Sequence, residues 1–403
     1  MNKSPLTKKQ IIKLFKKQKT IIAKSELIDL KNSQGRFLFA DLKSKVNLPP
    51  FNNTAVDGYA LLKKDLNNKY FYCNRRIAAG DKKNIKIKSG EAIRVFTGAK
   101  MPSNSSTIIM QENTSIEKEK IKILKFPSFG ENYRLKGEDI KKNQKILSKG
   151  LKINHQNINL IAASGIRKVK VFKKIKIGFF TSGNELRKPT KNLKNSEINN
   201  SNYFALNSLL DKKFISKKYF GNLKDNLRIV KSNLLSASKK NNIIITAGGA
   251  SVGDEDHLIN ALSSLGNIFF WRAAIKPGRP IAVGKINNCY IICLPGNPVS
   301  VQLLYAMLIN PLIEKLSGGN FKLPNSNKIA ANFSMKKKTQ RMEWLRIIKK
   351  TMNNQDVAIK YPKQGSGMIS SVSYSDGIIE IDEDVNEIKK GDIFNFYDFE
   401  TLF

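Results

Sequence analysis

The sequence predicts a multidomain protein with a parallel α/β sheet domain, an inserted strand-rich domain, a helical N-terminal segment and a small, β-barrel-like C-terminal domain. One observation is the length, because 403 residues exceed a compact domain of about 100–200 residues. A second is a succession of strand, glycine turn and helix that occurs three times between residues 171 and 318. A third is that short apolar segments, separated by Gly, Asn and Pro, precede and follow this part, which is typical of strands.

The hydrophobic pattern sets the predicted domain boundaries. Residues 1–43 carry apolar side chains at helical spacing, and together with residues 141–170 they form the predicted elongated N-terminal helical domain. Residues 44–140 form the inserted strand-rich domain, residues 171–318 the α/β domain, and residues 319–403 the C-terminal β domain. We expect the three strands of the α/β domain to run parallel, with ligands at their carboxyl ends.

The chain is strongly basic, with 71 Lys and Arg against 32 Asp and Glu and a formal net charge of +39. The excess is spread over three-quarters of the chain, and no nucleic-acid reading module is visible, so we expect no specific nucleic-acid partner. Two explanations of the charge stay open. One is a compositional drift toward Lys, Asn and Ile, and the other is attraction of anionic ligands to the surface.

Cysteine and histidine are scarce. Three cysteines cannot form a disulfide framework, and two histidines make a structural zinc site improbable. The first residues lack the apolar core of a secretory signal, and the sequence PGNP interrupts the longest apolar stretch, so we expect no membrane span. These features predict a cytoplasmic protein.

Three glycine-rich turns follow the three strands of the α/β domain. Glycine permits close backbone approach, and a turn that opens a helix points free N–H groups at an anion. Acidic residues stand in two of the turns, and carboxylates beside bound phosphate indicate a bridging hard cation, Mg²⁺. The alternative is three ordinary turns whose acids cap helices. The predicted ligand-binding and acidic residues of these turns are Glu185; Gly248, Gly249, Ser251, Gly253 and Asp256; and Pro295, Gly296 and Asn297.

A further turn is cationic. Lys276 and Arg279 stand in the proline-bounded sequence KPGRP, a rigid setting that suits an oxyanion, which the guanidinium of Arg279 can bind with two hydrogen bonds. The alternative is a solvated hairpin turn in a chain rich in lysine.

The order of these motifs resembles the MoeA family, the molybdopterin molybdenumtransferases that include the E domain of gephyrin. The resemblance covers essentially the whole chain. The motifs that carry it most specifically are LPPFNNTAVDGYA (48–60), TAGGASVGDEDH (246–257), IKPGRPIAVG (275–284), LPGNPVSV (294–301) and GSGMISS (365–371).

The resemblance implies a MogA-like α/β domain that binds adenylylated molybdopterin and molybdate, uses Mg²⁺, inserts the metal into the dithiolene and releases AMP. By motif, it implies catalytic roles for Asp57, Thr97, Glu185, Asp225 and Asp256, with Glu185 and Asp256 serving the metal. It also implies substrate or oxyanion contacts from Asp139, Gly248, Gly249, Ser251, Gly253, Lys276, Arg279, Pro295, Gly296, Asn297, Ser366 and Ser371. One departure is Asn200, where the family often has Asp.

The resemblance further implies a two-fold homodimer whose active site is shared, with the strand-rich domain of one chain facing the α/β and C-terminal domains of the other. Two other functions are weighed. A molybdopterin adenylyltransferase shares the α/β domain but lacks the strand-rich insertion and the C-terminal domain. A non-catalytic scaffold on the same fold would not need the acids or the cationic turn.

Overall fold

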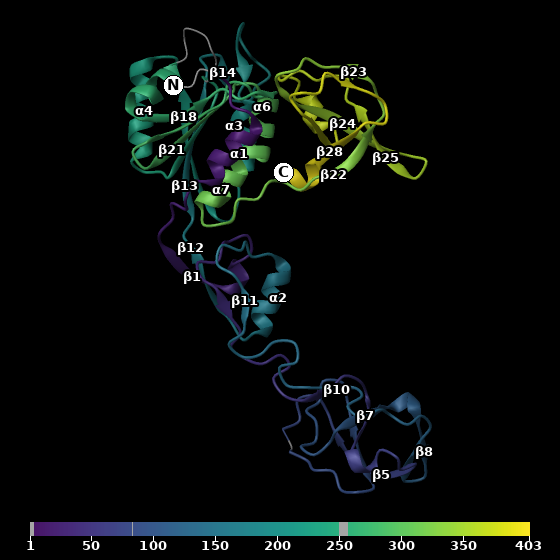
Figure 1. The fold of residues 1–403 in the computed structure, drawn as a ribbon. Helices are drawn as coiled ribbons and strands as arrows, with labels where there is room; N and C mark the ends of the chain where they lie inside the picture. Colours follow the sequence, from purple (N-terminus) through teal and green to yellow (C-terminus); the bar gives the residue numbers. More distant parts are fainter. Residues whose placement is uncertain (1–3, 83, 250–256) are drawn as a thin grey trace.

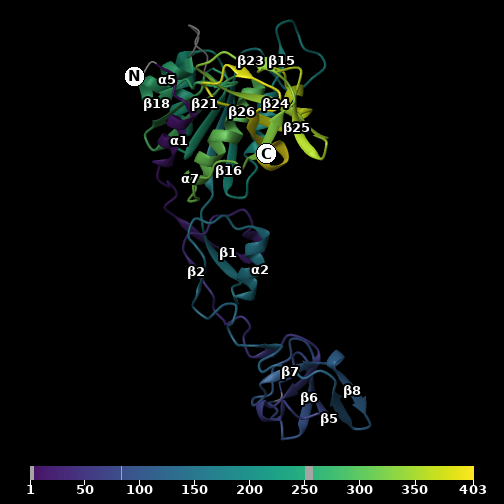
Figure 2. The same cartoon turned by 45° about the vertical axis from the view of Figure 1, so that its right-hand side comes forward.

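The computed structural model describes residues 4–82, 84–249 and 257–403, which form an elongated molecule (Figure 1). One end, here called the head, contains the α/β sheet and the C-terminal β domain side by side, and comprises the described residues of 4–22 and 173–403. A small middle domain follows (residues 23–47 and 141–172), and the distal domain (residues 48–140) forms the other end. The same order is visible after a 45° turn (Figure 2).

The head is built on a six-stranded sheet of order β16-β13-β17-β21-β20-β18. The three strands expected from the sequence, β13, β17 and β21, lie next to one another and run parallel, which confirms that part of the prediction. The bounds are β13 Ile175–Ser182, β16 Ile215–Leu223, β17 Ile243–Ala247, β18 Asn267–Trp271, β20 Ala282–Ile286 and β21 Cys289–Leu294.

The sheet is not wholly parallel, however. β20 runs antiparallel to both of its neighbours, β18 and β21. The tight turn Asn287-Asn288 joins it directly to β21. Asn287 has φ +52°, the left-handed conformation that such short hairpin turns require and that asparagine tolerates. A two-residue turn leaves no room for a crossover helix, so this pair has to be antiparallel.

Helices cover both faces of this sheet. Ile243 and Ile245 of β17 pack in one core with α1, α3, α6 and α7, whereas Ile244 packs on the opposite face with α4 and α5. This follows from the two-residue period of a strand. The helices are α1 Lys8–Lys16, α3 Ser201–Leu209, α4 Leu227–Ser238, α5 His257–Leu265, α6 Pro298–Leu304 and α7 Asn310–Leu316, with a π-helical turn, Tyr305–Ile309, between the last two.

The continuous helical run Pro298–Leu316 is the one helix among the described residues with the length and apolar composition of a membrane span. It is mostly buried, however, and most of its apolar side chains, from Val299 to Leu316, belong to the core that faces the sheet. This run is therefore the core helix of the α/β domain.

The N-terminal segment is less helical than predicted. Helix α1 ends at Lys16, and the chain then forms β1 (Ser25–Asp29), which pairs with β12 (Lys168–Phe172). Ile11 and Phe15 of α1 pack in the core of the head, so this helix does not belong to the middle domain. Local spacing could not show this, because the partner strand of β1 comes about 140 residues later in the chain.

Among its described residues, the middle domain contains one α-helix, α2 (His155–Ala163), one turn of 3-10 helix (Leu30–Asn32) and two strand pairs. The second pair joins β2 (Leu42–Lys43) to β11 (Lys145–Leu147). Leu38, Ile161 and Val171 belong to its own core. The predicted helical domain is therefore a mixed α/β body.

The distal domain has a six-stranded sheet of order β7-β4-β6-β5-β9-β8, with a buried hydrophobic cluster on each face. This agrees with the predicted strand-rich insertion. The chain enters and leaves through the antiparallel bridge between Leu48 and Ile140. The strands are β3 Asn53–Thr54, β4 Gly58–Leu61, β5 Tyr70–Ile77, β6 Glu91–Val95, β7 Thr107–Met110, β8 Thr114–Glu117, β9 Lys120–Ile123 and β10 Tyr133–Arg134.

The C-terminal domain is a small closed barrel, as predicted. Its strands pair in the order β24-β25-β22-β28-β26, and β26 pairs back with β24. The short strand β19 (Ile275–Lys276) of the cationic turn also pairs with β24, which ties that turn to the barrel. The remaining elements are β14 Leu186–Arg187, β15 Ile198–Asn199, β22 Asn327–Ala331, β23 Met335–Lys336, β24 Met342–Met352, β25 Gln355–Lys360, α8 Ser370–Ser373, β26 Gly377–Ile381, β27 Glu387–Ile388, β28 Ile393–Asp398 and α9 Phe399–Leu402.

Candidate active site

A cavity of about 680 Å³ lies where β13, β17 and β21 end. Because parallel strands bring their carboxyl ends to one edge of the sheet, the three glycine turns meet there. The residues after these strands that line the cavity are Gly183 and Glu185, Gly248 and Gly249, and Pro295, Gly296 and Asn297. The sequence predicted all of these except Gly183 as site residues.

Two of these glycines are required by the geometry. Gly248 has φ +100°, and a Cβ there would lie 2.4 Å from the carbonyl oxygen of Ser182. Gly183 has φ +144°, and a Cβ there would lie 2.4 Å from Oε2 of Glu185. The turns can therefore pack closely and leave backbone exposed to the cavity only because these positions lack a side chain.

The acidic side of the cavity is formed by Glu185 and Asp225, which the sequence placed near the metal and phosphate. Both side chains are exposed to solvent. Asp256, the second predicted metal ligand, lies outside the described residues, as do Ser251 and Gly253. Among the described residues, no group of three His, Cys, Asp or Glu side chains forms a complete metal site.

Asn202 contributes a polar group that sequence reasoning missed. Its Nδ2 donates to the carbonyl oxygen of Gly296 at 2.7 Å, while its buried Oδ1 has no donor among the described residues. A buried acceptor without a partner is costly, and this residue lines the cavity. Two carboxylates and an unpaired amide oxygen form an all-oxygen donor set, which fits the preference of Mg²⁺.

Asn200, the departure from the family pattern, has a structural role. Its Oδ1 accepts from the backbone N–H of Tyr203 and caps α3, and its Nδ2 donates to Thr181 Oγ1 at 2.9 Å. It is buried and does not line the cavity, whereas its neighbours Asn199 and Asn202 do. The signal missed in the sequence was therefore two residues further along, at the last Asn of NNSN.

A second lobe of about 230 Å³ adjoins the first, since Pro280, Pro295 and Asn297 line both. Its cationic side chains include the predicted Lys276 and Arg279. Further lining residues are the predicted Ser366 and two that sequence reasoning missed, Arg341 and Gln364.

Glu343 of the barrel contacts the cationic turn. Lys276 Nζ lies 2.7 Å from Glu343 Oε1, and the glutamate side chain is nine-tenths buried. The ion pair restrains Lys276 on the rim of the second lobe, next to the strand pairing of β19 with β24. Arg279, on the same turn, is exposed like Lys276, but forms no salt bridge within the described residues.

Ser371 does not line either lobe. It is fully buried, and its Oγ accepts a hydrogen bond of 3.2 Å from Arg346 Nε. Arg346 also donates to the carbonyl oxygens of Trp344 and Gly365, and desolvation lowers its pKa to about 10, so it remains cationic at neutral pH. Ser371 therefore supports the serine-rich loop, while Ser366 of the same loop lines the second lobe.

The remaining predicted residues lie far from this cavity. Thr97 donates to Asp57 Oδ1 through both its hydroxyl and its backbone N–H, each at 2.7 Å. These hydrogen bonds, the hydroxyl first, lower the pKa of Asp57, which keeps the carboxylate ionised at neutral pH. Asp139 is exposed in the segment that returns from the distal domain. Its backbone N–H donates to the carbonyl oxygen of Leu48.

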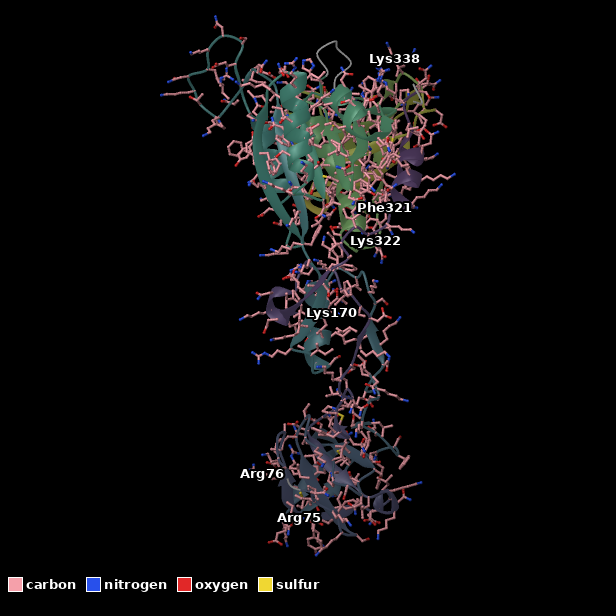
Figure 3. All side chains as sticks on the ribbon, turned by 90° about the vertical axis from the view of Figure 1, so that its left-hand side faces the viewer. Arg75, Arg76, Lys170, Phe321, Lys322 and Lys338 are labelled. Atoms are coloured by element: carbon pink, nitrogen blue, oxygen red, sulfur yellow. The ribbon has the colours of Figure 1, made fainter. Side chains whose placement is uncertain are left out.

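The middle domain separates these residues from the head. Figure 3 shows the separation from a third direction: Arg75 and Arg76 mark the distal domain, Lys170 the middle domain and Lys338 the head. One chain thus brings Glu185, Asp225 and the cationic turn together, and leaves Asp57 and Thr97 apart from them.

Three family models match the chain in order. The MoeA N-terminal region (domain I and II) matches residues 6–165, and a probable molybdopterin binding domain matches residues 178–315. The MoeA C-terminal region (domain IV) matches residues 328–399.

Relatives and solved structures agree with these matches. A molybdopterin molybdenumtransferase of Haemophilus influenzae is 30% identical over 382 residues, which cover 94% of this chain and 95% of the relative. One from Nostoc sp. is 32% identical over 304 residues, covering 73% of this chain and 70% of that protein. The crystal structure of a molybdopterin biosynthesis moeA protein from Pyrococcus horikoshii OT3 is 27% identical, with a TM-score of 0.85 over 98% of this chain and 100% of that one. Since both sequence and domain arrangement match along nearly its whole length, this chain belongs to the MoeA family.

Proposed function

We propose that the chain is a molybdopterin molybdenumtransferase of molybdenum cofactor biosynthesis. Its substrates would be adenylylated molybdopterin and molybdate, and AMP would be released. The names of the relatives support the reaction class. The structural observation that carries the proposal is a glycine-lined, acidic lobe directly adjoining a cationic lobe, with three lining residues in common.

The two lobes suit the two substrates. Backbone N–H groups around Gly248 and Gly296 suit the phosphates, because these turns allow close approach without side chains. Lys276, Arg279 and Arg341 suit molybdate, a tetrahedral dianion. Asn297 lines both lobes and would lie between the phosphates and the molybdate.

This arrangement orients the substrates rather than supplying a covalent nucleophile. The cationic lobe would hold molybdate beside the dithiolene, so that oxo ligands leave as water when the two sulfurs bind. The glycine lobe would hold the pyrophosphate while an oxygen nucleophile displaces AMP. The buried Cys289 and Cys293 lie within β21 and take no part, since the substrate supplies the sulfur ligands.

Mg²⁺ is part of this proposal. Glu185, Asp225 and Asn202 Oδ1 would hold it, together with Asp256. When bound, it would neutralise the charge of the pyrophosphate. Without a cation, the two carboxylates would repel the phosphates that the neighbouring glycines are shaped to receive.

We also propose a homodimer in which the active site is shared. The support is that Asp57 and Thr97 match the family motifs but belong to the distal domain, at the opposite end of the elongated molecule from the cavity (Figure 2). In a two-fold dimer with antiparallel subunits, the distal domain of one chain would lie next to the head of its partner. We place this enzyme in the cytoplasm.

The alternatives receive less support. The family matches extend over the distal domain and the C-terminal barrel, which an adenylyltransferase built on the α/β domain alone would not need. The cationic lobe is formed jointly by the α/β domain and the barrel, and a scaffold would have no use for it.

The decisive experiment is release of AMP from adenylylated molybdopterin, followed with and without molybdate and Mg²⁺. We expect release to require both ions, because the cavity carries an acidic and a cationic lobe. Equal release without molybdate would indicate a hydrolase and contradict the proposal. Release without any divalent cation would contradict the magnesium assignment alone.

A further inference from the structure

A second polar cavity, of about 450 Å³, lies at the junction of the middle domain and the head, well away from the candidate active site. This volume lies within the usual range for small-molecule sites. Two of its lining residues belong to β1, four come from the segment that follows β1, and two come from loops that flank strands of the head. They are Ile28, Asp29, Lys31, Asn32, Gln34, Arg36, Lys174 and Lys213.

The cavity is cationic. Its lining has four basic side chains and the carboxylate of Asp29, and one of the four, Arg36, is paired with Glu26 outside the lining. The carboxylate of Asp29 already accepts from the backbone N–H of Lys31 at 3.2 Å and lies 3.7 Å from Arg167 Nε. Within the described part of the chain, Lys31, Lys174 and Lys213 form no salt bridge. Like charges that converge on one cavity repel each other unless an anion lies between them.

Arg36 gives an independent indication of a missing partner. Its side chain is 6% exposed, and Nη2 contacts both Glu26 and the carbonyl oxygen of Phe172. Its buried Nε has no acceptor among the described residues. A guanidinium has five N–H donors, and leaving one unpaired in a buried position costs free energy. Arg36, a lining residue, therefore carries an unpaired buried donor next to the three lysines that have no salt bridge.

The cavity is formed by two bodies at once. Lys174 belongs to the connection between β12 of the middle domain and β13 of the head, and Lys213 lies between α3 and β16 of the head. The middle domain approaches closely here, since a Cβ at Gly35 would lie 3.4 Å from Lys213 Cβ. A ligand in this cavity would contact both sides of the junction.

We propose that this cavity is a binding site for a small phosphate-bearing anion of the diphosphate class. Lysine ammonium groups and an arginine fork are the side chains that proteins use for phosphate, and the amides of Asn32 and Gln34 add neutral donors. Arg36 is already paired with Glu26, and the three lysines without a salt bridge match an anion of more than one negative charge. The site goes beyond the proposed transferase reaction and requires none of its residues.

Lysine acetylation, mapped by mass spectrometry, tests the site locally and so separates it from phosphate binding at the active site. The full chain is treated with an amine-acetylating reagent at a constant ionic strength of about 0.15 M, so that screening is equal in all samples. The probes are inorganic pyrophosphate, ADP and orthophosphate. We expect pyrophosphate at about 1 mM to slow acetylation of Lys174 and Lys213 about fivefold, which corresponds to a dissociation constant of about 0.25 mM.

The three probes separate the possible sources of the phosphate. Protection by ADP as strong as that by pyrophosphate would mean that the site contacts only the two phosphates of the ligand. Stronger protection by ADP would mean that the cavity also holds the nucleoside. Either result supports the site, whereas no protection by any probe at about 10 mM overturns it.

Two variants control for general charge effects. In Lys174→Gln/Lys213→Gln, the remaining reporter Lys31 should lose its protection by pyrophosphate. Lys336→Gln/Lys338→Gln removes the same charge from exposed positions of the barrel and should leave the protection of Lys31 unchanged. Equal protection of Lys336 and Lys338 in the unaltered chain, or persistent protection of Lys31 in the first variant, would contradict the proposal.

Discussion

The head and the distal domain each carry part of the predicted catalytic set, but they hold it in different ways. In the head, residues from three strand ends, the cationic turn and the barrel loop line two adjoining lobes. In the distal domain, Asp57, just before β4, accepts two hydrogen bonds from Thr97, just after β6. The head therefore gathers the proposed binding residues of one chain around its own cavity, whereas the distal pair is a hydrogen-bonded contact that lies apart from that cavity.

Residues that belong to one family pattern can therefore lie either close together or far apart in the folded chain. Parallel strands bring residues more than 100 positions apart to one edge, as with Glu185 and Asn297. The middle domain keeps Asp57 away from both, although the same family pattern connects all three (Figure 1).

The largest effect is expected from removing charge in the acidic lobe. Glu185→Gln and Asp225→Asn should each lower turnover by about 100-fold or more, because each removes a carboxylate from the proposed cation site. Both side chains are exposed, so the melting temperature should change little. AMP release against Mg²⁺ concentration, together with a thermal melt, is the measurement.

Asp211→Asn is the matched control, since Asp211 is an exposed head carboxylate whose partner is Lys217. It should leave both turnover and stability near the parent values. Full activity of the Asp225→Asn and Glu185→Gln variants would instead mean that these acids have no catalytic role. The head would then hold less of the catalytic set than its cavity suggests.

The next effect separates a shared site from a site within one chain. Asp57→Ala and Asp225→Ala chains, each inactive alone, are co-expressed in equal amounts. In a two-fold dimer, each mixed dimer has one cleft with both lesions and one with none. Random pairing makes about half of the dimers mixed, so activity should return to about a quarter of the parent value.

Differently tagged chains allow the mixed dimers to be isolated by tandem affinity purification before AMP release is measured. Isolated mixed dimers should have about half the parent activity. If they are as inactive as the single variants, Asp57 does not complete the active site of the partner chain, and the shared site is excluded.

The smallest effects distinguish lining from support within the barrel loop. Ser366→Ala removes a hydroxyl from the cationic lobe and should raise the molybdate KM about fivefold without changing stability. Ser371→Ala leaves the buried Arg346 Nε without its acceptor and should lower the free energy of unfolding by about 1–3 kcal/mol. Molybdate titration and denaturant unfolding measure the two effects. The reverse pattern would mean that the serine assignments are exchanged.

Local patterns were sufficient for much of the head. Short apolar runs predicted β13, β17 and β21, and glycine after each run predicted the turns that line the cavity. Gly248 illustrates why, since its requirement for φ +100° and for close approach to Ser182 is a property that only glycine meets. The cationic pair Lys276 and Arg279 was likewise predicted from a short, rigid motif.

Long-range pairing was beyond local patterns. The N-terminal segment resembled a continuous helix, but β1 forms because β12 offers a partner about 140 residues later. The role of Asn202 depends on α3, which places its amide next to Gly296. The contact of Glu343 with Lys276 depends on the pairing of β24 with the cationic turn.

The sequence alone therefore determined the family, the central parallel strands, the glycine turns and the charged residues of the site. Tertiary structure decided which of those residues meet: it joined the two lobes through Asn297, buried Ser371 under Arg346, and separated Asp57 from the cavity by a whole domain. The physical reason is that strand propensity, turn chemistry and charge are properties of short segments. Contacts between distant segments, in contrast, depend on the packing of complete domains.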